Sequence, residues 1–227
     1  MCGRYTQTVT DPQLLAQTFH LENTPSGLAP RYNIAPSQSV ATIVKDEANR
    51  NRLAMMRWGL IPSWAKDATV GNRMINARAE TLAEKPSFRA AFRSRRCLVV
   101  ADGFYEWKTN DDGSKTPIYI RLKDGSIFGM AGLWEQWKDP ATGELITSCT
   151  IITTDPNELI KPLHHRMAVI MPQADYEQWL DPRQTDTQQL EPLLRPYTAA
   201  EMTAYPVSTR VNNAKYDGPD LIDPLVE

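Results

Sequence analysis

The sequence predicts an α+β fold with a mainly antiparallel sheet and peripheral helices. Strand-like segments dominate the middle of the chain, and the gaps between them are mostly too short for helical crossovers, which favours antiparallel pairing. Amphipathic helical segments lie toward both ends. No internal repeat, low-complexity tract or long Pro/Gly/Ser linker divides the 227 residues, so a single domain over 1–227 is expected.

The first half begins with a short polar segment and a predicted helix. Asp11-Pro12 is typical of an N-cap followed by proline at the first helical position. The spacing of Leu14, Leu15, Phe19 and Leu21 then predicts one amphipathic helix. Segments 39–44 and 53–58 read as strands separated by a polar turn around 47–51, and 87–93 as a short basic helix.

The second half is richer in strands. Residues 97–101 predict a buried strand, and Asp102-Gly103 predicts a turn into the next one. With a hairpin tip at 110–113, the strands expected here are 104–108, 118–122, 127–134 and 147–153. Helices are expected near 174–180, 188–194 and 198–205, the last beginning with a Thr198…Glu201 capping box.

Bulk composition is that of a soluble globular protein, with 41% hydrophobic and 23% charged residues. No apolar run approaches the ~18 residues that cross a bilayer, and the N-terminus lacks an apolar signal region. Three cysteines are too few, and odd in number, for a disulfide framework, so a reducing, cytoplasmic location is expected.

The net charge of -2 hides an asymmetry along the chain. Residues 1–100 carry 14 Lys and Arg against 7 Asp and Glu, whereas the remaining residues carry 11 against 20. Arginine, whose planar fork suits phosphate, outnumbers lysine 16 to 9. A phosphate-binding face built from the first half is one reading, and mixing of these charges in the folded molecule is the other.

Common cofactor and metal motifs are missing from the sequence. It contains no phosphate-binding glycine loop, Cys-x-x-Cys pair or His-Glu-x-x-His motif. The three cysteines are scattered, and the histidines number three. We therefore expect no cofactor and no metal site.

The unusual feature of the sequence is a cysteine at position 2. Methionine before a small residue is commonly removed, which leaves Cys2 with a free amine beside its thiol. An α-amine of pKa about 7.7–8.0 is about one quarter unprotonated near pH 7.4, and it forms a Schiff base with an aldehyde. The thiol then closes a thiazolidine ring. The alternative is that Cys2 is only a small residue near a frayed end.

Aromatic and arginine side chains gather at 57–64 and 76–80. Trp64 follows Pro62-Ser63, where it could stack on a base, and the neighbouring arginines could bind phosphates. Alternatively, the tryptophans pack in the core and the arginines form a solvated face. For Trp58 the core is the favoured reading; for Trp64 both readings stay open.

Two further motifs carry titratable groups. Glu106 lies among aromatics after a buried strand; burial would raise its pKa and suit it to proton transfer, whereas propensity alone favours an outward-facing side chain. His164 and His165 precede an apolar strand, where one of them could move protons or contact phosphate. If the pair lies in an extended strand, only one histidine faces the site.

Together these clusters resemble the SRAP (SOS response-associated peptidase) family of abasic-site processing proteins, over nearly the whole chain. The resemblance rests on the joint order of Cys2-Gly3-Arg4, Arg31-Tyr32-Asn33-Ile34-Ala35-Pro36, Arg57-Trp58-Gly59, Ile75-Asn76-Ala77-Arg78, Asp102-Gly103-Phe104-Tyr105-Glu106-Trp107, His164-His165-Arg166-Met167 and Pro206-Val207-Ser208. It implies a single domain with a curved, barrel-like sheet and a basic channel. Ala168 departs from the proline that many members have, and only a slightly altered loop is expected.

The resemblance also implies roles for particular residues. Cys2 would crosslink to the ring-opened abasic site in single-stranded DNA, Asn76 would position the modified terminus, Glu106 would shuttle protons, and His164 would assist sugar opening. The DNA-binding residues would be Arg4, Trp64, Arg78 and Arg166. It further implies self-removal of Met1, a lyase side reaction, a role in the DNA damage response and a monomer with no membrane partner.

Two other functions are compatible with the sequence. An N-terminal-nucleophile peptidase acting in trans would cleave peptides through Cys2 without DNA. A non-covalent single-strand DNA binder would use the arginines and Trp64, and its complex would dissociate in denaturant.

Overall fold

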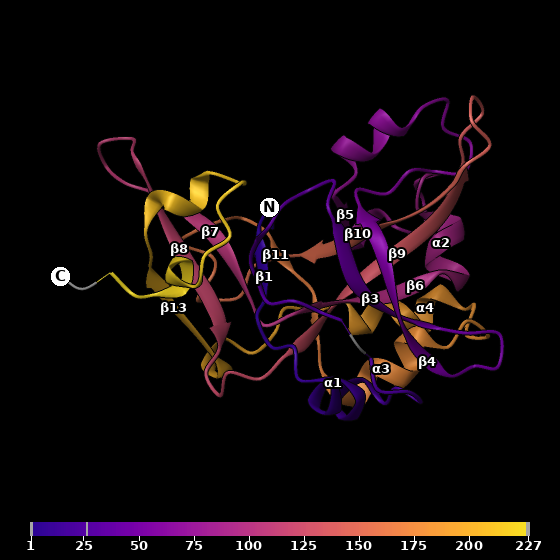
Figure 1. Ribbon diagram of the computed structural model, residues 1–227, viewed down its shortest axis with the longest axis horizontal. Helices are drawn as coiled ribbons and strands as arrows, with labels where there is room; N and C mark the ends of the chain where they lie inside the picture. The colour runs from indigo at the N-terminus through magenta and orange to yellow at the C-terminus, as the bar shows by residue number, and fades with distance from the viewer. Residues whose placement is uncertain (1, 26, 226–227) are drawn as a thin grey trace.

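The computed structural model describes residues 2–25 and 27–225, which form two sheets side by side (Figure 1). The smaller sheet is antiparallel throughout its pairings. Its five strands run in the order β13 (Met202–Pro206), β8 (Lys115–Leu122), β7 (Gly103–Thr109), β1 (Tyr5–Gln7) and β2 (Arg31–Ile34).

The larger sheet closes on itself. Its order is β11 (Met167–Ala168), β10 (Leu145–Thr154), β4 (Asn51–Trp58), β3 (Ser39–Lys45), β6 (Arg96–Ala101), β9 (Phe128–Lys138) and β12 (Ile170–Met171), with β5 (Asn76–Arg78) on β10. Because β9 also pairs with β10, the strands β10, β4, β3, β6 and β9 form a closed five-stranded barrel. Among the strands that the structure describes, β10 pairs in parallel with β4 and β5, and the other strand pairs are antiparallel. The predicted mainly antiparallel, barrel-like α+β fold is confirmed.

Strand β6 separates two hydrophobic clusters, and it shows why the barrel wall is apolar on both faces. All six of its residues are buried. Leu98 and Val100 pack in a cluster with the helices, whereas Cys97 and Val99 pack in a second cluster with Cys2. Since neighbouring side chains in a strand point to opposite faces, this alternation places the helices on one side of β6 and the N-terminal cysteine on the other.

The α-helices are short, and several lie together beside the barrel in Figure 1. Asp11 caps the first by accepting hydrogen bonds from the backbone N–H groups of Gln13 and Leu14, as the sequence predicts. The α-helices are α1 (Pro12–Phe19), α2 (Arg89–Ser94), α3 (Tyr176–Leu180) and α4 (Thr187–Leu190). Short 3₁₀ turns occupy η1 (Ala68–Arg73), η2 (Ala79–Thr81), η3 (Gln173–Asp175), η4 (Glu191–Leu193), η5 (Ala199–Glu201), η6 (Thr209–Asn212) and η7 (Pro219–Ile222). Within the described residues, no helix combines the length and apolar character needed to cross a membrane.

The helix predicted over 198–205 is wrong. Only η5 is helical there, and the chain then extends into β13, which pairs with β8 along its length. Thr198 makes no side-chain cap, so the predicted capping box is absent. The pairing of five consecutive residues with β8, with Met202 buried, outweighs the local helix signal.

Asp102 fixes the N-terminal strand at the turn between β6 and β7. Its carboxylate is 5% exposed and accepts hydrogen bonds from the Thr6 hydroxyl at 2.5 Å, the Thr8 hydroxyl at 2.8 Å, and the backbone N–H of Val9 at 2.8 Å. The backbone N–H of Thr8 donates as well. Four donors on one buried carboxylate set the position of the strand that leads back to Cys2.

Gly103 completes this junction because no side chain fits at its position. The Tyr119 hydroxyl lies 2.9 Å from the Thr6 hydroxyl. A Cβ on Gly103 would lie 2.1 Å from that Tyr119 oxygen, so any other residue would displace the ring. The Asp102-Gly103 turn predicted from the sequence is therefore also a packing site.

We expect Asp102→Asn to lower the free energy of unfolding by about 2 kcal/mol or more. The amide cannot accept hydrogen bonds through its nitrogen, so buried donors lose a charged acceptor. Urea unfolding measures the change. Asp124→Asn is the matched control, since its exposed turn carboxylate accepts from Ser126, and it should change stability by less than about 1 kcal/mol. Equal losses in the two variants would contradict the anchoring role of Asp102.

Candidate active site around Cys2

Cys2 lies in the core and not at a frayed end. Its side chain is fully buried in the cluster that also contains Tyr5 and Trp58. β1 pairs with β7 so that Tyr5 lies opposite Phe104, and the backbone N–H of Tyr105 donates to Arg4. The same antiparallel register brings the start of the chain alongside Glu106.

Asn76 holds the backbone of Cys2 from the barrel side. Its Nδ2 donates to the Cys2 carbonyl at 3.0 Å. Asn76 is fixed in turn by β5, where it pairs with Ile151 of β10. Its Oδ1 is buried and has no hydrogen-bond partner among the residues that the structure describes. The Asn76 Oδ1 is therefore a hydrogen-bond acceptor next to the backbone of Cys2, the candidate nucleophile.

Glu106 faces inward, so the outward orientation favoured by propensity alone is wrong. Its side chain is 3% exposed, and burial raises its pKa to about 7. A carboxyl group with this pKa takes up and releases protons near neutral pH. The sequence left open whether the Glu106 side chain is buried. The structure buries it, which is the environment suited to proton transfer.

The Cys2 thiol is neutral near pH 7. Burial raises its pKa far above the ordinary range, and the Glu106 charge raises it further, whereas the Arg4 backbone hydrogen bond lowers it. The β1–β7 register, in which Tyr5 lies opposite Phe104, places Cys2 and Glu106 near each other. A neutral thiol that acts as a nucleophile must lose its proton, so such a role would require a proton acceptor beside the sulfur.

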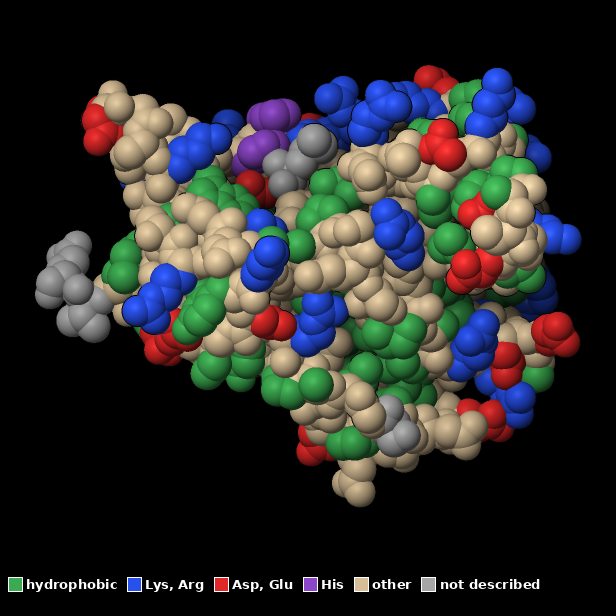
Figure 2. Space-filling model, turned by 45° about the horizontal axis from the view of Figure 1, so that its top comes forward, with side chains coloured by type: hydrophobic (Ala, Val, Ile, Leu, Met, Phe, Trp, Pro, Cys, Tyr) green, Lys and Arg blue, Asp and Glu red, His purple; other side chains and the backbone are tan. Residues whose placement is uncertain are grey.

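His164 and His165 stack on each other, contrary to the expectation that neighbouring rings point to opposite faces. Their ring centroids are 4.3 Å apart, because the chain bends at His165 and enters β11 only at Met167. His164 Nδ1 lies 3.0 Å from the Arg166 backbone nitrogen. Burial lowers the His164 pKa, which favours the neutral imidazole near pH 7. Figure 2 shows two adjacent histidine side chains on the surface with Lys and Arg on both sides.

Arg166 makes a dense set of protein contacts. It is 8% exposed, and its two terminal nitrogens bind the Glu80 carboxylate at 2.8 and 2.9 Å. It also donates to the Thr153 carbonyl at 2.5 Å and to Asp155 at 3.2 Å. Sequence reasoning missed Glu80 as its partner, although Glu80 ends the 76–80 motif. The phosphate contact expected of Arg166 stays a prediction.

The remaining predicted DNA-binding residues differ in exposure. Arg4 is half-buried and donates to Asn33 at 2.8 Å and to the Val211 carbonyl at 2.7 Å. Arg78 is exposed, and within the described parts of the chain no hydrogen bond or ion pair engages its guanidinium. Trp64 is 61% exposed, whereas Trp58 is in the core, as favoured.

The structure thus brings Cys2, Asn76 and Glu106 together and places Arg78 on the strand that carries Asn76. His164 is joined through Arg166 to Glu80, two residues after Arg78. Across residues 2–25 and 27–225 no group of three His, Cys, Asp or Glu side chains could hold a metal ion.

The fold and site together define a class of α+β proteins in which a barrel and a second sheet bury a cysteine at position 2 beside an amide and a carboxyl of raised pKa. The chain belongs to the SOS response associated peptidase (SRAP) family, whose family model matches residues 1–214. The family resemblance of the sequence is confirmed.

Relatives and solved structures agree with this membership. The abasic site processing protein YoqW of Bacillus subtilis is 49% identical over 98% of this chain and 99% of its own length. The abasic site processing protein HMCES of Gallus gallus is 32% identical over 86% of this chain and 66% of its own length. A crystal structure of a protein from Bacteroides thetaiotaomicron superimposes with a TM-score of 0.88 at 29% identity, covering 99% of this chain and all of that one.

Proposed function

We propose that this protein processes abasic sites in DNA by forming a covalent crosslink between Cys2 and the opened sugar in single-stranded DNA. The observation that carries the proposal is the burial of the Cys2 thiol beside Asn76 and Glu106. The names of the relatives support the substrate class. We propose that the protein acts as a monomer.

The first step is removal of Met1. Hydrolysis of the peptide bond before Cys2 consumes one water and releases methionine, which converts an unreactive amide nitrogen into an amine. Asn76 keeps the Cys2 carbonyl in place during this change. Glu106, with a pKa of about 7, accepts a proton from the attacking group and returns it to the new amine.

The second step opens the closed abasic sugar. A proton leaves the C1′ hydroxyl, the bond from C1′ to the ring oxygen breaks, and that oxygen receives a proton, which yields an aldehyde. His164 is suited to this transfer because its imidazole is neutral near pH 7. Because the Arg166 backbone N–H donates to Nδ1, the neutral ring carries its proton on Nε2, which gives that proton to the ring oxygen and takes up the C1′ hydroxyl proton in its place.

The third step joins protein and DNA. The Cys2 amine attacks C1′ and one water leaves, giving an imine. The sulfur then bonds to C1′, and the thiol proton ends on the former imine nitrogen, which closes the thiazolidine ring. Glu106 relays that proton because the buried thiol does not ionise by itself. Before ring closure, removal of a C2′ proton from the imine and departure of the 3′ phosphate, with formation of a C2′–C3′ double bond, give the lyase side reaction.

The proposed DNA contacts follow from the exposure of the arginine and tryptophan side chains. Arg78 supplies an accessible guanidinium for a phosphate, and Trp64 a surface on which a base can stack. Both terminal nitrogens of Arg166 and one terminal nitrogen of Arg4 are already bonded to the protein, so we propose that Arg78 contributes most.

Incubation with a single-stranded abasic oligonucleotide, followed by a denaturing gel and intact-mass measurement, tests the proposal. We expect a heat-stable adduct and a protein mass lacking methionine. A complex that dissociates in denaturant would indicate a non-covalent binder. Cleavage of added peptides with no adduct would indicate a peptidase acting in trans.

We expect His164→Ala to slow crosslinking by at least about tenfold, since general acid–base catalysis contributes about 10²–10⁴-fold and Glu106 covers part of the loss. His165→Ala, which removes the exposed ring of the stacked pair, should stay within a few-fold of the parent. Single-turnover rates on one abasic oligonucleotide give the comparison. A slower His165 variant would show that the histidines are assigned in the wrong order.

A further inference from the structure

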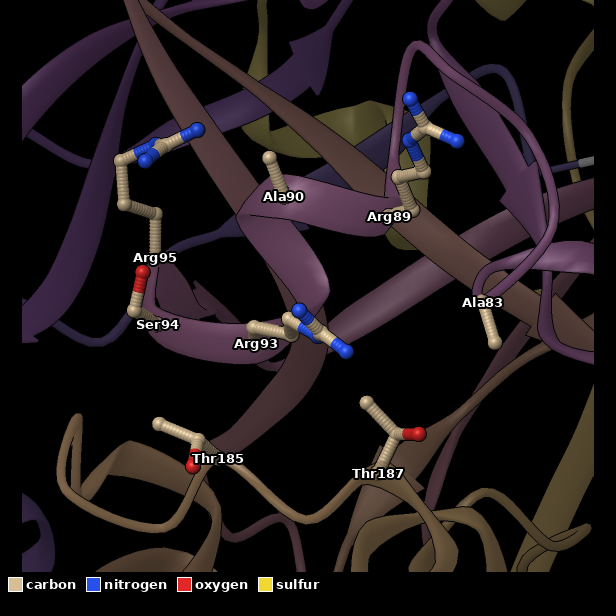
Figure 3. A pocket seen from close by; sticks show the side chains of 8 residues that line it. All are labelled: Ala83, Arg89, Ala90, Arg93, Ser94, Arg95, Thr185 and Thr187. Carbon is tan, nitrogen blue, oxygen red and sulfur yellow. The ribbon is translucent and has the colours of Figure 1, made fainter.

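A basic pocket of about 950 Å³ lies at helix α2, on a part of the barrel that the Cys2 chemistry does not use (Figure 3). One wall is α2 and the other is the segment before α4. Its lining residues are Ala83, Arg89, Ala90, Arg93, Ser94, Arg95, Thr185 and Thr187. The lining contains three guanidinium groups and three hydroxyls but no carboxylate, which suits an anion.

The two walls are joined by the buried side chain of Arg96. Its guanidinium donates to the backbone carbonyls of Phe92 and Arg93 at the end of α2. It also donates to the Asp181 and Gln184 carbonyls at 2.5 and 3.0 Å, in the segment that leads to Thr185. Because one buried side chain bonds both walls, their relative position is fixed before any ligand binds.

Two of the lining arginines are available to a ligand. Arg95 is bound to Glu135 at 2.7 Å. Arg89 and Arg93 are exposed, and in the described residues neither side chain has a hydrogen bond or ion pair. They stand four positions apart on α2, a spacing that puts both on one side of the helix. In Figure 3 the Arg93 side chain lies between α2 and Thr187.

Two carboxylates near the pocket are engaged in ion pairs. Glu135 binds Arg95, and Glu80 binds Arg166. Asp186, between the two lining threonines, accepts from the backbone N–H of Gln188 at 3.0 Å as the cap of α4. In the part of the chain that the structure describes, neither Arg89 nor Arg93 forms an ion pair, although Asp186 and the exposed Glu84 lie next to lining residues.

The pocket is linked along the chain to the candidate DNA-binding residue Arg78. Arg78 immediately precedes η2, and Ala83, two residues after η2 ends, lines the pocket. Around the barrel, Asn76 pairs with Ile151, Ile151 with Gly132, and Gly132 with Cys97, the residue after Arg96. Three strand spacings of ~4.8 Å make a path of roughly 15 Å along the barrel wall from Asn76, at the Cys2 site, to Cys97, on the strand that follows the pocket helix.

We propose that this α2 pocket binds phosphates of the same single DNA strand whose abasic nucleotide lies at Cys2. The inference rests on the proposed function, since it assigns the ligand as a longer stretch of that strand. Paired guanidinium groups and hydroxyls recognise phosphate oxygens and do not read sequence. At ~3.4 Å per stacked nucleotide, a gap of roughly 15 Å corresponds to more than about four nucleotides, so only longer strands reach the pocket.

The test compares two oligonucleotides with a central abasic site, one of about 5 nucleotides and one of about 25. Arg89→Gln/Arg93→Gln should weaken non-covalent binding of the long strand roughly tenfold and reduce its log–log salt slope by about 1.4. Binding of the short strand and crosslinking at saturating DNA should not change. Arg50→Gln/Arg183→Gln removes the same charge from exposed sites outside the pocket and is the matched control.

Arg78→Ala gives a second comparison, because it should weaken both strands. The α2 inference is overturned if the double variant binds the long strand like the parent, weakens both lengths equally, or matches the control. Crosslinking of the short strand by the parent is a separate result that depends on the proposed function alone. If the parent crosslinks neither strand, the proposed function is wrong as well.

Discussion

Cys2→Ala is expected to remove the heat-stable crosslink, to below about 1% of the parent yield. After Met1 removal the variant keeps an amine and forms an imine, but it has no sulfur to close the ring. The imine hydrolyses or loses the 3′ phosphate, so strand cleavage should rise relative to the adduct. A denaturing gel resolves adduct, intact strand and cleaved strand in one lane.

Cys2→Ser is the matched variant for this prediction because it preserves shape and changes only the nucleophilic atom. It should also lack the durable adduct, since a hydroxyl is the weaker nucleophile. Unfolding curves of both variants exclude a loss caused by misfolding of the core around position 2. A heat-stable adduct from the alanine variant would rule out the thiazolidine.

Glu106→Gln is expected to slow both Met1 removal and crosslinking by about 10²–10⁴-fold, because it deletes the proton acceptor beside a thiol that is neutral near pH 7. Glutamine keeps the size of the side chain. In the parent, the crosslinking rate should increase as pH rises through about 7, where the Glu106 carboxyl loses its proton. In the Glu106→Gln variant this increase through about pH 7 should disappear, and only the pH dependence caused by titration of the Cys2 amine should remain. An unchanged pH profile would count against Glu106.

As pH rises through about 7, the contribution of Glu106 to folding stability should decrease while the crosslinking rate increases. Burial raises the Glu106 pKa above that of an unfolded chain, so its contribution to folding stability is present below about pH 4.5 and is lost as pH rises through about 7. The glutamine variant should therefore be more stable than the parent above pH 7. Urea unfolding at pH 5 and pH 8 measures the difference, and a less stable variant at the higher pH would contradict this environment for Glu106.

Local sequence signals predicted the barrel better than the second sheet. The strands at 39–44, 53–58, 97–101 and 147–153 are long and apolar, and all are present. β1 and β2 have three and four residues, too short to show a period, and exist because they pair with β7 and with each other. β13 was mistaken for a helix because its partner, β8, is eighty residues away in the sequence.

Local sequence signals have the same limit at the candidate active site. Residue types pointed to Cys2 and Glu106, but only tertiary structure decides whether a carboxyl or thiol is buried. The stacked histidines contradict the strand geometry expected for them because the chain bends at His165. The Arg166–Glu80 ion pair joins residues that are 86 positions apart, and no local sequence pattern predicts such a contact.

Complete burial of Cys2 also bears on resistance to oxidants. Peroxides and alkylating agents react with exposed thiolates, whereas this sulfur is enclosed and carries its proton. In the proposed reaction an abasic aldehyde is brought to Cys2 by the bound strand, whereas a small electrophile in solution is not positioned by any such binding. Under oxidative conditions, which damage bases and thiols alike, the protein should therefore keep its nucleophile reduced when exposed cysteines do not.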